Sequence, residues 1–148
     1  MTLTSSFSIA TTGLDVQAER IKIHANNIAN SVTPNYVRKV PVLYEDNSMS
    51  FQDVVAGMHQ GVLTSANAYV PGGVAMPGVM EDPTPGKKVY QPGHPEADKN
   101  GFVLQSNVNV ISDIADATAT ARLYEANLAV VGIVKTMANR AMEIGRGN

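Results

Sequence analysis

The stretch Val110–Gly145, VISDIADATATARLYEANLAVVGIVKTMANRAMEIG, decides the fold of this 148-residue chain. It contains no proline, and its apolar residues recur every three or four positions. This spacing predicts one long helix that buries a narrow stripe against another helix. Asp113 near the start and Arg140 near the end complement the helix dipole. Gly145 supplies a stop.

A helix of this length extends roughly 50 Å at about 1.5 Å per residue. A compact chain of 148 residues would have a diameter of about 38 Å. The helix is therefore longer than the globule that the chain could form. Two explanations remain open: the helix is broken, with Gly132 as the candidate position, or it packs on something other than this chain.

A second helix is predicted over residues 5–29, with apolar residues at the same spacing. Asn30 is expected to take a left-handed turn at its end, and Pro34 prevents the helix from continuing. Because both helices carry one apolar stripe, we expect them to pack as an antiparallel, coiled-coil-like pair. The fold class is predicted to be α+β, with a small irregular β-rich module between the helices.

A rough energy balance indicates that this pair is incomplete by itself. About fourteen stripe side chains contribute some 20–30 kcal/mol on burial. Ordering about sixty residues costs on the order of 60–100 kcal/mol of conformational entropy before hydrogen bonds are counted. Both helices therefore need further neighbours, and we expect the chain to assemble with other molecules.

The region between the helices has a different composition, because it contains all eight prolines and most of the glycines. The domain division predicted from this change is residues 1–30 plus 109–148 as a helical domain and 31–108 as a β-rich module. The expected elements of the module are strands at 36–44, 74–80, 87–90 and 102–104, a helical turn at 50–57 and a loop at 57–73. Pro41 favours a place at a sheet edge for the first strand.

Composition and motifs give no support for chemistry or for nucleic-acid binding. The net charge is −2 with no basic run, and there is no cysteine. The three histidines, His24, His59 and His94, have no second ligand three or four positions away. The acidic pairs Glu45-Asp46 and Glu81-Asp82 are sequence neighbours and do not face each other across a cleft. We therefore predict no catalytic residue, cofactor, metal site, small-molecule substrate or nucleic-acid partner.

The N-terminal residues contain no basic region followed by a long apolar run, and no stretch is apolar enough to span a bilayer. If the protein leaves the cytoplasm, a route other than a cleaved signal peptide must carry it.

Two stretches are not explained by local structure alone. The first is Ala25-Asn26-Asn27-Ile28-Ala29-Asn30, with three asparagines where a helix should end. The second runs from Val89 to Val103 and contains Tyr90, Pro92, Gly93, His94 and Pro95, which read locally as tight turns.

The first of these stretches resembles the N-terminal signature of bacterial flagellar rod and hook proteins. The second, followed by Asn107-Val108-Asn109, is similar to a more specific signature of the proximal rod type within this axial family. Ser106 departs from that pattern, which usually has proline before Asn-Val-Asn. The resemblance covers most of the chain.

This resemblance implies a structural subunit of the flagellar basal-body rod, located in the periplasm-spanning rod. It implies polymerisation into a helical tube that transmits torque and forms the export channel. The expected partners are other rod proteins, copies of the same chain, basal-body ring proteins and export-gate adaptor proteins. Export would follow the flagellar type III route without a cleaved signal peptide.

The residues expected to pack between subunits are those of the two helical stripes and the asparagine motif. They are Phe7, Leu14, Ile21, Asn26, Asn27, Ile28, Asn30, Ile114, Ala121, Tyr124, Leu128, Val131 and Met142. The family motif of the middle module comprises Tyr90, Pro92, Gly93, His94, Pro95, Asn107 and Asn109. Two alternatives stay open: a soluble binding module that does not assemble, and a wall hydrolase associated with the rod.

Overall fold

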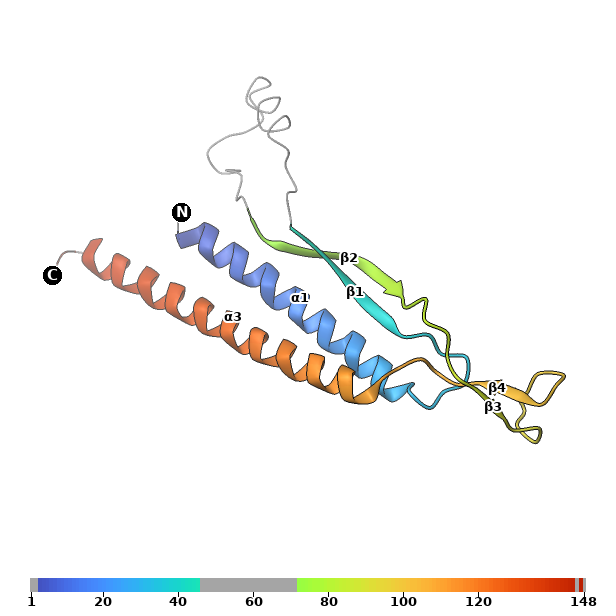
Figure 1. The fold of residues 1–148 in the computed structure, drawn as a ribbon. Coiled ribbons are helices and arrows are strands. Elements are labelled where there is room, and N and C mark those ends of the chain that lie inside the picture. The colour runs from blue at the N-terminus through green and yellow to red at the C-terminus, as the bar shows by residue number, and fades with distance from the viewer. Residues whose placement is uncertain (1–2, 46–71, 146, 148) are drawn as a thin grey trace, which may run out of the picture. The chain divides into compact units, whose positions relative to one another are not determined.

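The computed structural model describes residues 3–45, 72–145 and 147. Along the sequence, one long helix precedes the four strands and another follows them (Figure 1). The elements are α1 (Leu3–Ala29), β1 (Lys39–Glu45), β2 (Val74–Glu81), β3 (Lys88–Tyr90), β4 (Phe102–Leu104) and α3 (Val110–Gly145). The predicted α+β class and all four predicted strands are confirmed. The helical turn expected at 50–57, and the loop at 57–73 except for its last two residues, lie outside the described residues.

The long C-terminal helix has the predicted bounds and is continuous. The alternative that it breaks at Gly132 is wrong, because a single glycine costs a helix only about 1 kcal/mol relative to alanine. The expected left-handed turn at Asn30 is also wrong. Asn35 has a φ of 61° instead, and its amide N–H donates to the Leu104 carbonyl at 2.9 Å.

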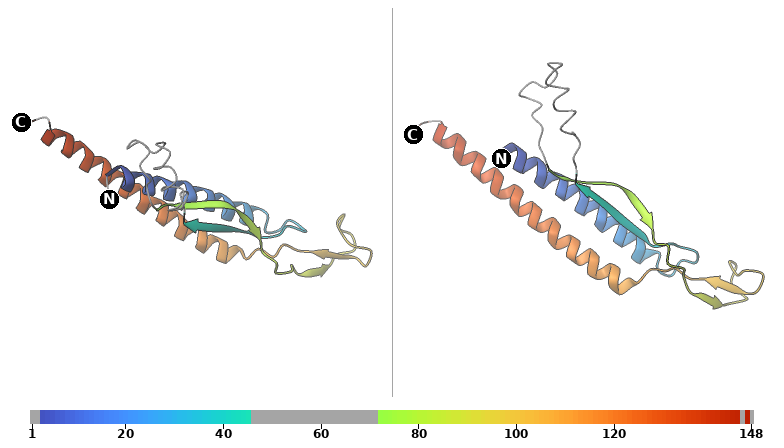
Figure 2. Two further views of the ribbon diagram at one scale, coloured as in Figure 1. Left: turned by 90° about the horizontal axis from the view of Figure 1, so that it is seen from above. Right: turned by 45° about the horizontal axis from the view of Figure 1, so that its top comes forward.

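The strands form two two-stranded sheets. β1 pairs with β2, and both views of Figure 2 show the two strands side by side. Both strands of such a sheet are edge strands, which explains why Pro41 is tolerated within β1. The first strand begins at Lys39 and not at the predicted Tyr36. β3 and β4 are antiparallel, with Val89 opposite Val103.

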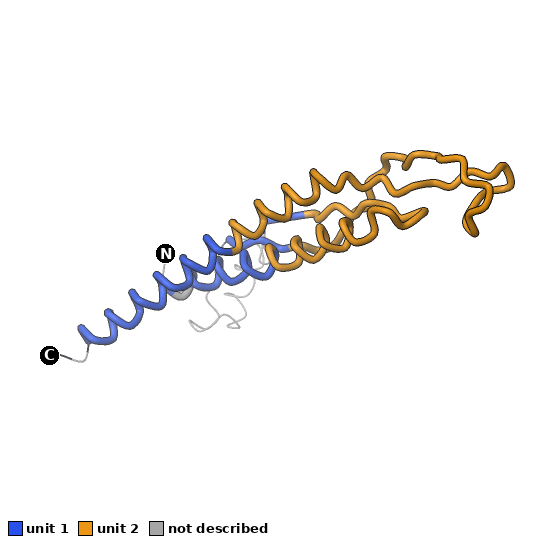
Figure 3. The backbone as a smooth tube through the Cα atoms, turned by 90° about the horizontal axis from the view of Figure 1, so that it is seen from below, with its two compact units in different colours: residues 1–16, 43–75, 125–148 blue, residues 17–42, 76–124 orange. Residues whose placement is uncertain are grey.

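The described chain divides into two compact units, coloured separately in Figure 3. The first comprises residues 1–16, 43–75 and 125–148, and the second comprises residues 17–42 and 76–124. Each unit contains part of both helices and part of the region between them. The two units are defined by contacts within the structure. The predicted division into a helical domain and a β-rich module was based on composition, and it remains a prediction.

The two helices are in contact within each unit. In the first unit, a Cβ atom on Gly13 of α1 would lie 2.8 Å from the Asn127 side-chain nitrogen of α3. In the second unit, His24 and Asn27 of α1 donate hydrogen bonds to Asp113 of α3. Within each unit the segments of α1 and α3 run in opposite directions (Figure 1), so the helices are antiparallel, as predicted.

The buried side of α1 differs from the predicted stripe. Ala10 belongs to the predicted stripe and is buried, but the other most buried apolar side chains of this helix are Val16 and Ile23, and Phe7 of the stripe is 43% exposed. The reason is that α1 also has neighbours among the strands, since the Val74 amide N–H donates to Thr12 Oγ1. Because α1 is covered on two sides, its most buried side chains are not only those that face α3.

In the part of the chain that the structure describes, no helix combines the length and apolarity required to cross a bilayer.

Candidate functional site

The second unit is organised around the carboxylate of Asp113, in the first turn of α3. This side chain is fully buried. Its Oδ1 accepts hydrogen bonds from His24 Nδ1 at 2.9 Å and from Asn27 Nδ2 at 3.2 Å. Its Oδ2 accepts from Arg38 Nε at 3.0 Å. An ionised carboxylate has no proton to donate, so the contact requires a proton on His24 Nδ1.

The charges of this cluster support one another. Burial acts to raise the pKa of Asp113, but hydrogen bonds from Arg38, His24 and Asn27 and the positive charge of Arg38 hold it below its usual value. The hydrogen bond to Asp113 raises the pKa of Arg38. The guanidinium also approaches Asp82 at 3.7 Å and Asp116 at 3.6 Å. Arg38 therefore neutralises a buried charge and joins β1 to α3.

Asn27 is the buried residue of the asparagine motif, with no exposed surface. Its Nδ2 donates to the Lys39 carbonyl and to Asp113, and its Oδ1 accepts from the Lys39 amide and the Tyr36 hydroxyl. The amide side chain thus uses all of its bonding capacity inside the chain. We leave Asn27 out of the proposed subunit surface for this reason. Asn26 is exposed, and its Oδ1 also accepts from the Tyr36 hydroxyl.

The second asparagine pair lies on the segment that leads into α3. Asn107 Oδ1 accepts from the Arg38 amide at 2.6 Å, and its Nδ2 donates to the carbonyls of Asp82 and Thr84. Asn109 Oδ1 accepts from the Ser112 amide and so caps α3. Ser106, which replaces the expected proline, accepts from the Val108 amide through its Oγ. These residues hold the entry of α3 against the start of β1.

The remaining motif residues belong to the β3–β4 hairpin and its turn. Tyr90 and Phe102 pack edge to face, with ring centroids 5.3 Å apart. His94 Nδ1 accepts from the Glu96 amide, and Asp98 Oδ1 accepts from the Phe102 amide. Gly101 adopts a φ of 79°, a backbone conformation that suits glycine. Pro92 and Gly93 form one turn of the connection between these strands, and Pro95 lies in the next. The motif residues of the hairpin therefore stabilise the turns that connect β3 to β4.

Among the described residues, His24, Asp113 and Asp116 form a group whose ligand atoms lie within 4.8 Å of one another. Spacing along the chain could not indicate this group, because its members come from different helices. Arg38 already pairs with both carboxylates. A metal ion would have to displace that cation, so the group fits an ion-pair network better than a metal site.

The predicted subunit-packing residues divide by exposure. Phe7, Ile114, Leu128 and Met142 are exposed, by 43%, 50%, 52% and 60%. Leu14, Ile21, Ile28, Asn30, Ala121, Tyr124 and Val131 are half-buried. Further exposed apolar side chains on α3 were not predicted: Ile111, Leu123, Val130, Ile133, Met137 and Ile144. They lie outside the stripe of apolar residues that recur every three or four positions, and the spacing indicated no second stripe.

Sequence reasoning assigned Asp113 only to the helix dipole and did not single out Arg38. The one available signal was that Arg38 is a basic residue in the strand predicted after the asparagine motif. That signal does not reveal that its partner is Asp113. The contacts of Asp113 depend on residues 75 or more positions away.

Comparison with known proteins first gives the class. Residues 7–36 match the family described as "Flagella basal body rod protein". Residues 99–144 match "Flagellar basal body rod FlgEFG protein C-terminal". These two segments include the asparagine motif and all of α3 except its last residue, so both helical ends of the chain match the class of flagellar basal-body rod proteins.

The curated relatives narrow this class. Flagellar basal-body rod protein FlgC of Salmonella typhimurium is 32% identical over 99% of this chain and 100% of its own length. FlgC of Escherichia coli O157:H7 is 31% identical over the same shares. FlgC of Buchnera aphidicola subsp. Acyrthosiphon pisum is 29% identical over 97% of this chain and 98% of its own. The chain belongs to the FlgC family of flagellar basal-body rod proteins.

Proposed function

We propose that the chain is a structural, non-enzymatic subunit of the flagellar basal-body rod that acts by packing α3 and α1 against neighbouring subunits. The relatives named FlgC support the rod assignment. The two alternatives, a binding module that does not assemble and a wall hydrolase, have no comparable support from the relatives' names.

The observation that carries this proposal is the uncovered apolar surface of α3. In the first unit, Leu128, Ile133, Met137 and Met142 are each more than half exposed, while Val134 is buried. A helix that is apolar on several sides is stable only when several sides are covered. Exposed apolar patches rimmed by polar residues mark protein–protein contacts. Neighbouring subunits would provide that cover.

The finer parts of the proposal concern partners and location. The neighbours are other rod proteins and copies of this chain, arranged as a helical tube that transmits torque and encloses the export channel. Basal-body ring proteins and export-gate adaptor proteins contact the ends of this tube. The location is the periplasm-spanning rod, reached through the flagellar type III route without signal cleavage.

The polar network of the second unit serves this function by fixing the helix pair. Asp113 and Asn27 set which residues of α1 and α3 meet, because a buried carboxylate must find its partners. An apolar seam alone permits alternative registers. A fixed register presents the same apolar surface in every copy, as a regular assembly requires.

The test is substitution of Leu128, which is 52% exposed. We expect Leu128→Asp to abolish swimming and incorporation into basal bodies, because a carboxylate placed in an apolar contact remains unpaired. Leu128→Met, which keeps the apolar surface, should leave both intact. Circular dichroism of the purified variants checks that each folds as the parent does. Normal swimming of the Leu128→Asp strain would contradict the proposed function.

A further inference from the structure

The connection between β3 and β4 contains the one Asn-Gly pair of the chain, Asn100-Gly101. Asn100 is exposed. The carboxamides of Asn27 and Asn107 are hydrogen-bonded, whereas that of Asn100 has no hydrogen bond to any residue that the structure describes. No bond to those residues therefore holds the Asn100 side chain away from its own main chain.

An asparagine followed by glycine can modify itself. The main-chain nitrogen of Gly101 attacks Cγ of Asn100, and Nδ2 leaves as ammonia with the proton of the Gly101 N–H. A succinimide ring remains, and water adds to one of its two carbonyls and opens it. The product at position 100 is aspartate, or isoaspartate if the main chain now runs through the side-chain carboxyl. The reaction consumes only water, and glycine favours it because no Cβ atom crowds the attacking nitrogen.

The turn holds this attacking nitrogen in place. The Gly101 N–H donates to the Asp98 carbonyl at 2.9 Å. Asp98 Oδ1 accepts from the amides of Asn100 and Phe102 at 2.8 and 2.9 Å. A Cβ atom at Gly101 would lie 3.0 Å from Cε2 of Tyr90, so the tyrosine ring also confines this part of the main chain. The nitrogen cannot keep its N–H bonded to Asp98 and also lose that proton, so the turn must open before the ring closes.

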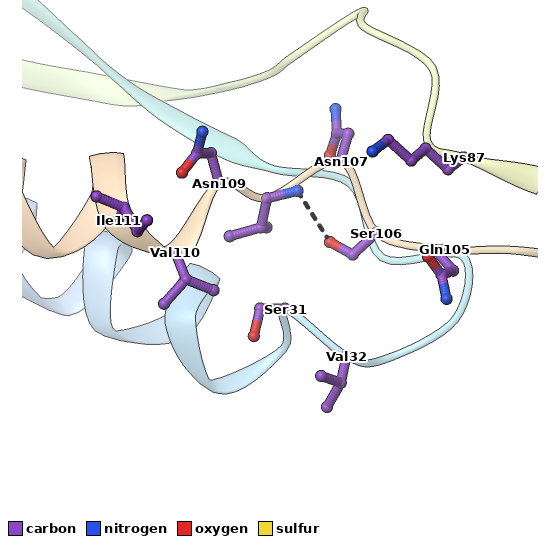
Figure 4. Close-up of a pocket in the computed structure, with 10 residues that line it drawn as sticks. Ser31, Val32, Lys87, Gln105, Ser106, Asn107, Asn109, Val110 and Ile111 are labelled. Atoms are coloured by element: carbon purple, nitrogen blue, oxygen red, sulfur yellow. Dashed lines mark hydrogen bonds between the residues drawn. The ribbon is translucent and has the colours of Figure 1, made fainter.

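The rest of the hairpin is held by separate contacts. β3 and β4 pair in register over all three residues of each strand. Next to the strands, the Gln105 amide donates to the Lys87 carbonyl at 2.8 Å, where both residues line a groove of about 600 Å³ (Figure 4). Because these bonds do not involve Asp98, the turn can open while the strands stay paired.

We propose that Asn100 is a site of spontaneous deamidation whose rate is set by the turn that Asp98 holds. The modification accumulates slowly in the folded chain and quickly whenever this turn opens. This inference does not depend on the proposed function.

Both products of the reaction disturb the turn. Aspartate places a second carboxylate close to Asp98. Isoaspartate lengthens the main chain by one methylene group before Gly101, which moves the Gly101 and Phe102 amides away from Asp98. The modification therefore leaves a lasting mark on chains whose turn has been open.

Incubation of the purified full chain at mildly alkaline pH, with and without urea, tests the proposal. Peptide mass spectrometry measures deamidation at each asparagine, and chromatography separates aspartate from isoaspartate. We expect Asn100 to react about tenfold faster in urea, because the bonds of the turn are lost. Asn139 is the internal control, since it is exposed on α3 and precedes Arg140, and it should react far more slowly than Asn100 in urea. Equal rates at Asn100 with and without urea, or no reaction there in urea, would overturn the proposal.

Two variants test the role of Asp98. Asp98→Ala removes the oxygen that accepts from Asn100 and Phe102, so it should speed deamidation in buffer by about tenfold. Asp98→Asn keeps an Oδ1 acceptor and should stay within about twofold of the parent. All three chains should react at the same rate in urea.

Circular dichroism checks that the helices of each variant stay folded, so that a faster reaction reports on the turn. If Asp98→Ala loses its helices, the comparison of the parent with and without urea decides the proposal. A folded Asp98→Ala chain that reacts at the parental rate in buffer would overturn the control by Asp98.

Discussion

At the scale of single residues, the central feature is a buried carboxylate that accepts hydrogen bonds from three side chains. Asp113 has no exposed surface and accepts from His24, Asn27 and Arg38. Breaking such a cluster by removing one partner is costly, since the remaining charge stays buried. Asn27 is uncharged, and its side chain also bonds the carbonyl and the amide of Lys39, which connects α1 to β1. The network therefore ties α1, β1 and α3 together at one point.

This network makes stability depend on acid pH. The folded-state pKa of Asp113 lies below its unfolded value of 3.8, so its contribution is present above about pH 4 and is lost as the pH falls through the lower folded value. We expect Asp113→Asn to destabilise the second unit by about 3 kcal/mol at pH 7 and to flatten its acid unfolding. Urea denaturation between pH 2 and 7 measures both effects.

The control for this titration is Asp15→Asn, which removes an exposed carboxylate from α1. That variant should follow the parent at every pH. If Asp113→Asn and the parent lost stability in parallel between pH 5 and 2, the network would not be the source of the acid dependence.

At the scale of the elements, a glycine of α1 lies against a side chain of α3 in the first unit. A Cβ atom at Gly13 would lie 2.8 Å from Asn127 Nδ2 and 3.3 Å from its Cγ. Real Cβ atoms essentially never approach that closely, so an alanine at this position would require the end of the Asn127 side chain to move. Gly132 of α3 has nothing within 4 Å of the corresponding position. The two helix glycines therefore have different consequences.

We expect Gly132→Ala to stabilise the helix by the full difference of about 1 kcal/mol between glycine and alanine. Gly13→Ala should gain less or lose stability, because Asn127 must move. Combining Gly13→Ala with Asn127→Ala should restore the gain, and a double-mutant cycle in urea isolates the coupling. Equal gains at the two glycines, with no coupling to Asn127, would show that the helices do not meet closely at Gly13.

At the scale of the whole molecule, the two units differ in what stabilises them. The second unit contains the buried network of Asn27, Arg38 and Asp113. Among the residues described, the first unit buries the apolar side chains Ala10, Val16 and Val134, and the second buries Ile23 and Val103, so the difference between the units is the polar network and not apolar burial. We expect the unit without this network to open first, because local opening there breaks fewer buried interactions. Because the helix pair is predicted to be incomplete by itself, both ends of the chain, residues 1–30 and 110–148, are expected to open first in a free subunit.

The structure narrows that expectation to residues 1–16 and 125–148. We expect trypsin to cleave dilute protein after Lys135 and Arg140 well before Lys22 and Arg122, although all four side chains are exposed. Local opening, and not exposure, then sets the rate. Mass spectrometry of the early fragments measures the order. Cleavage at Lys22 and Arg122 first, or at all four sites together, would contradict this.

The sequence by itself determined the helices, the four strands and the family. Local periodicity, proline positions and short motifs carry that information, because they depend on residues close together in the chain. The tertiary structure alone decided that Asn27 faces inward, that Arg38 meets Asp113, and that Val16 and Ile23 are buried while Phe7 is exposed. These outcomes depend on contacts between residues far apart in sequence, and on α1 having the strands as well as α3 for neighbours, which no periodicity within one helix can record.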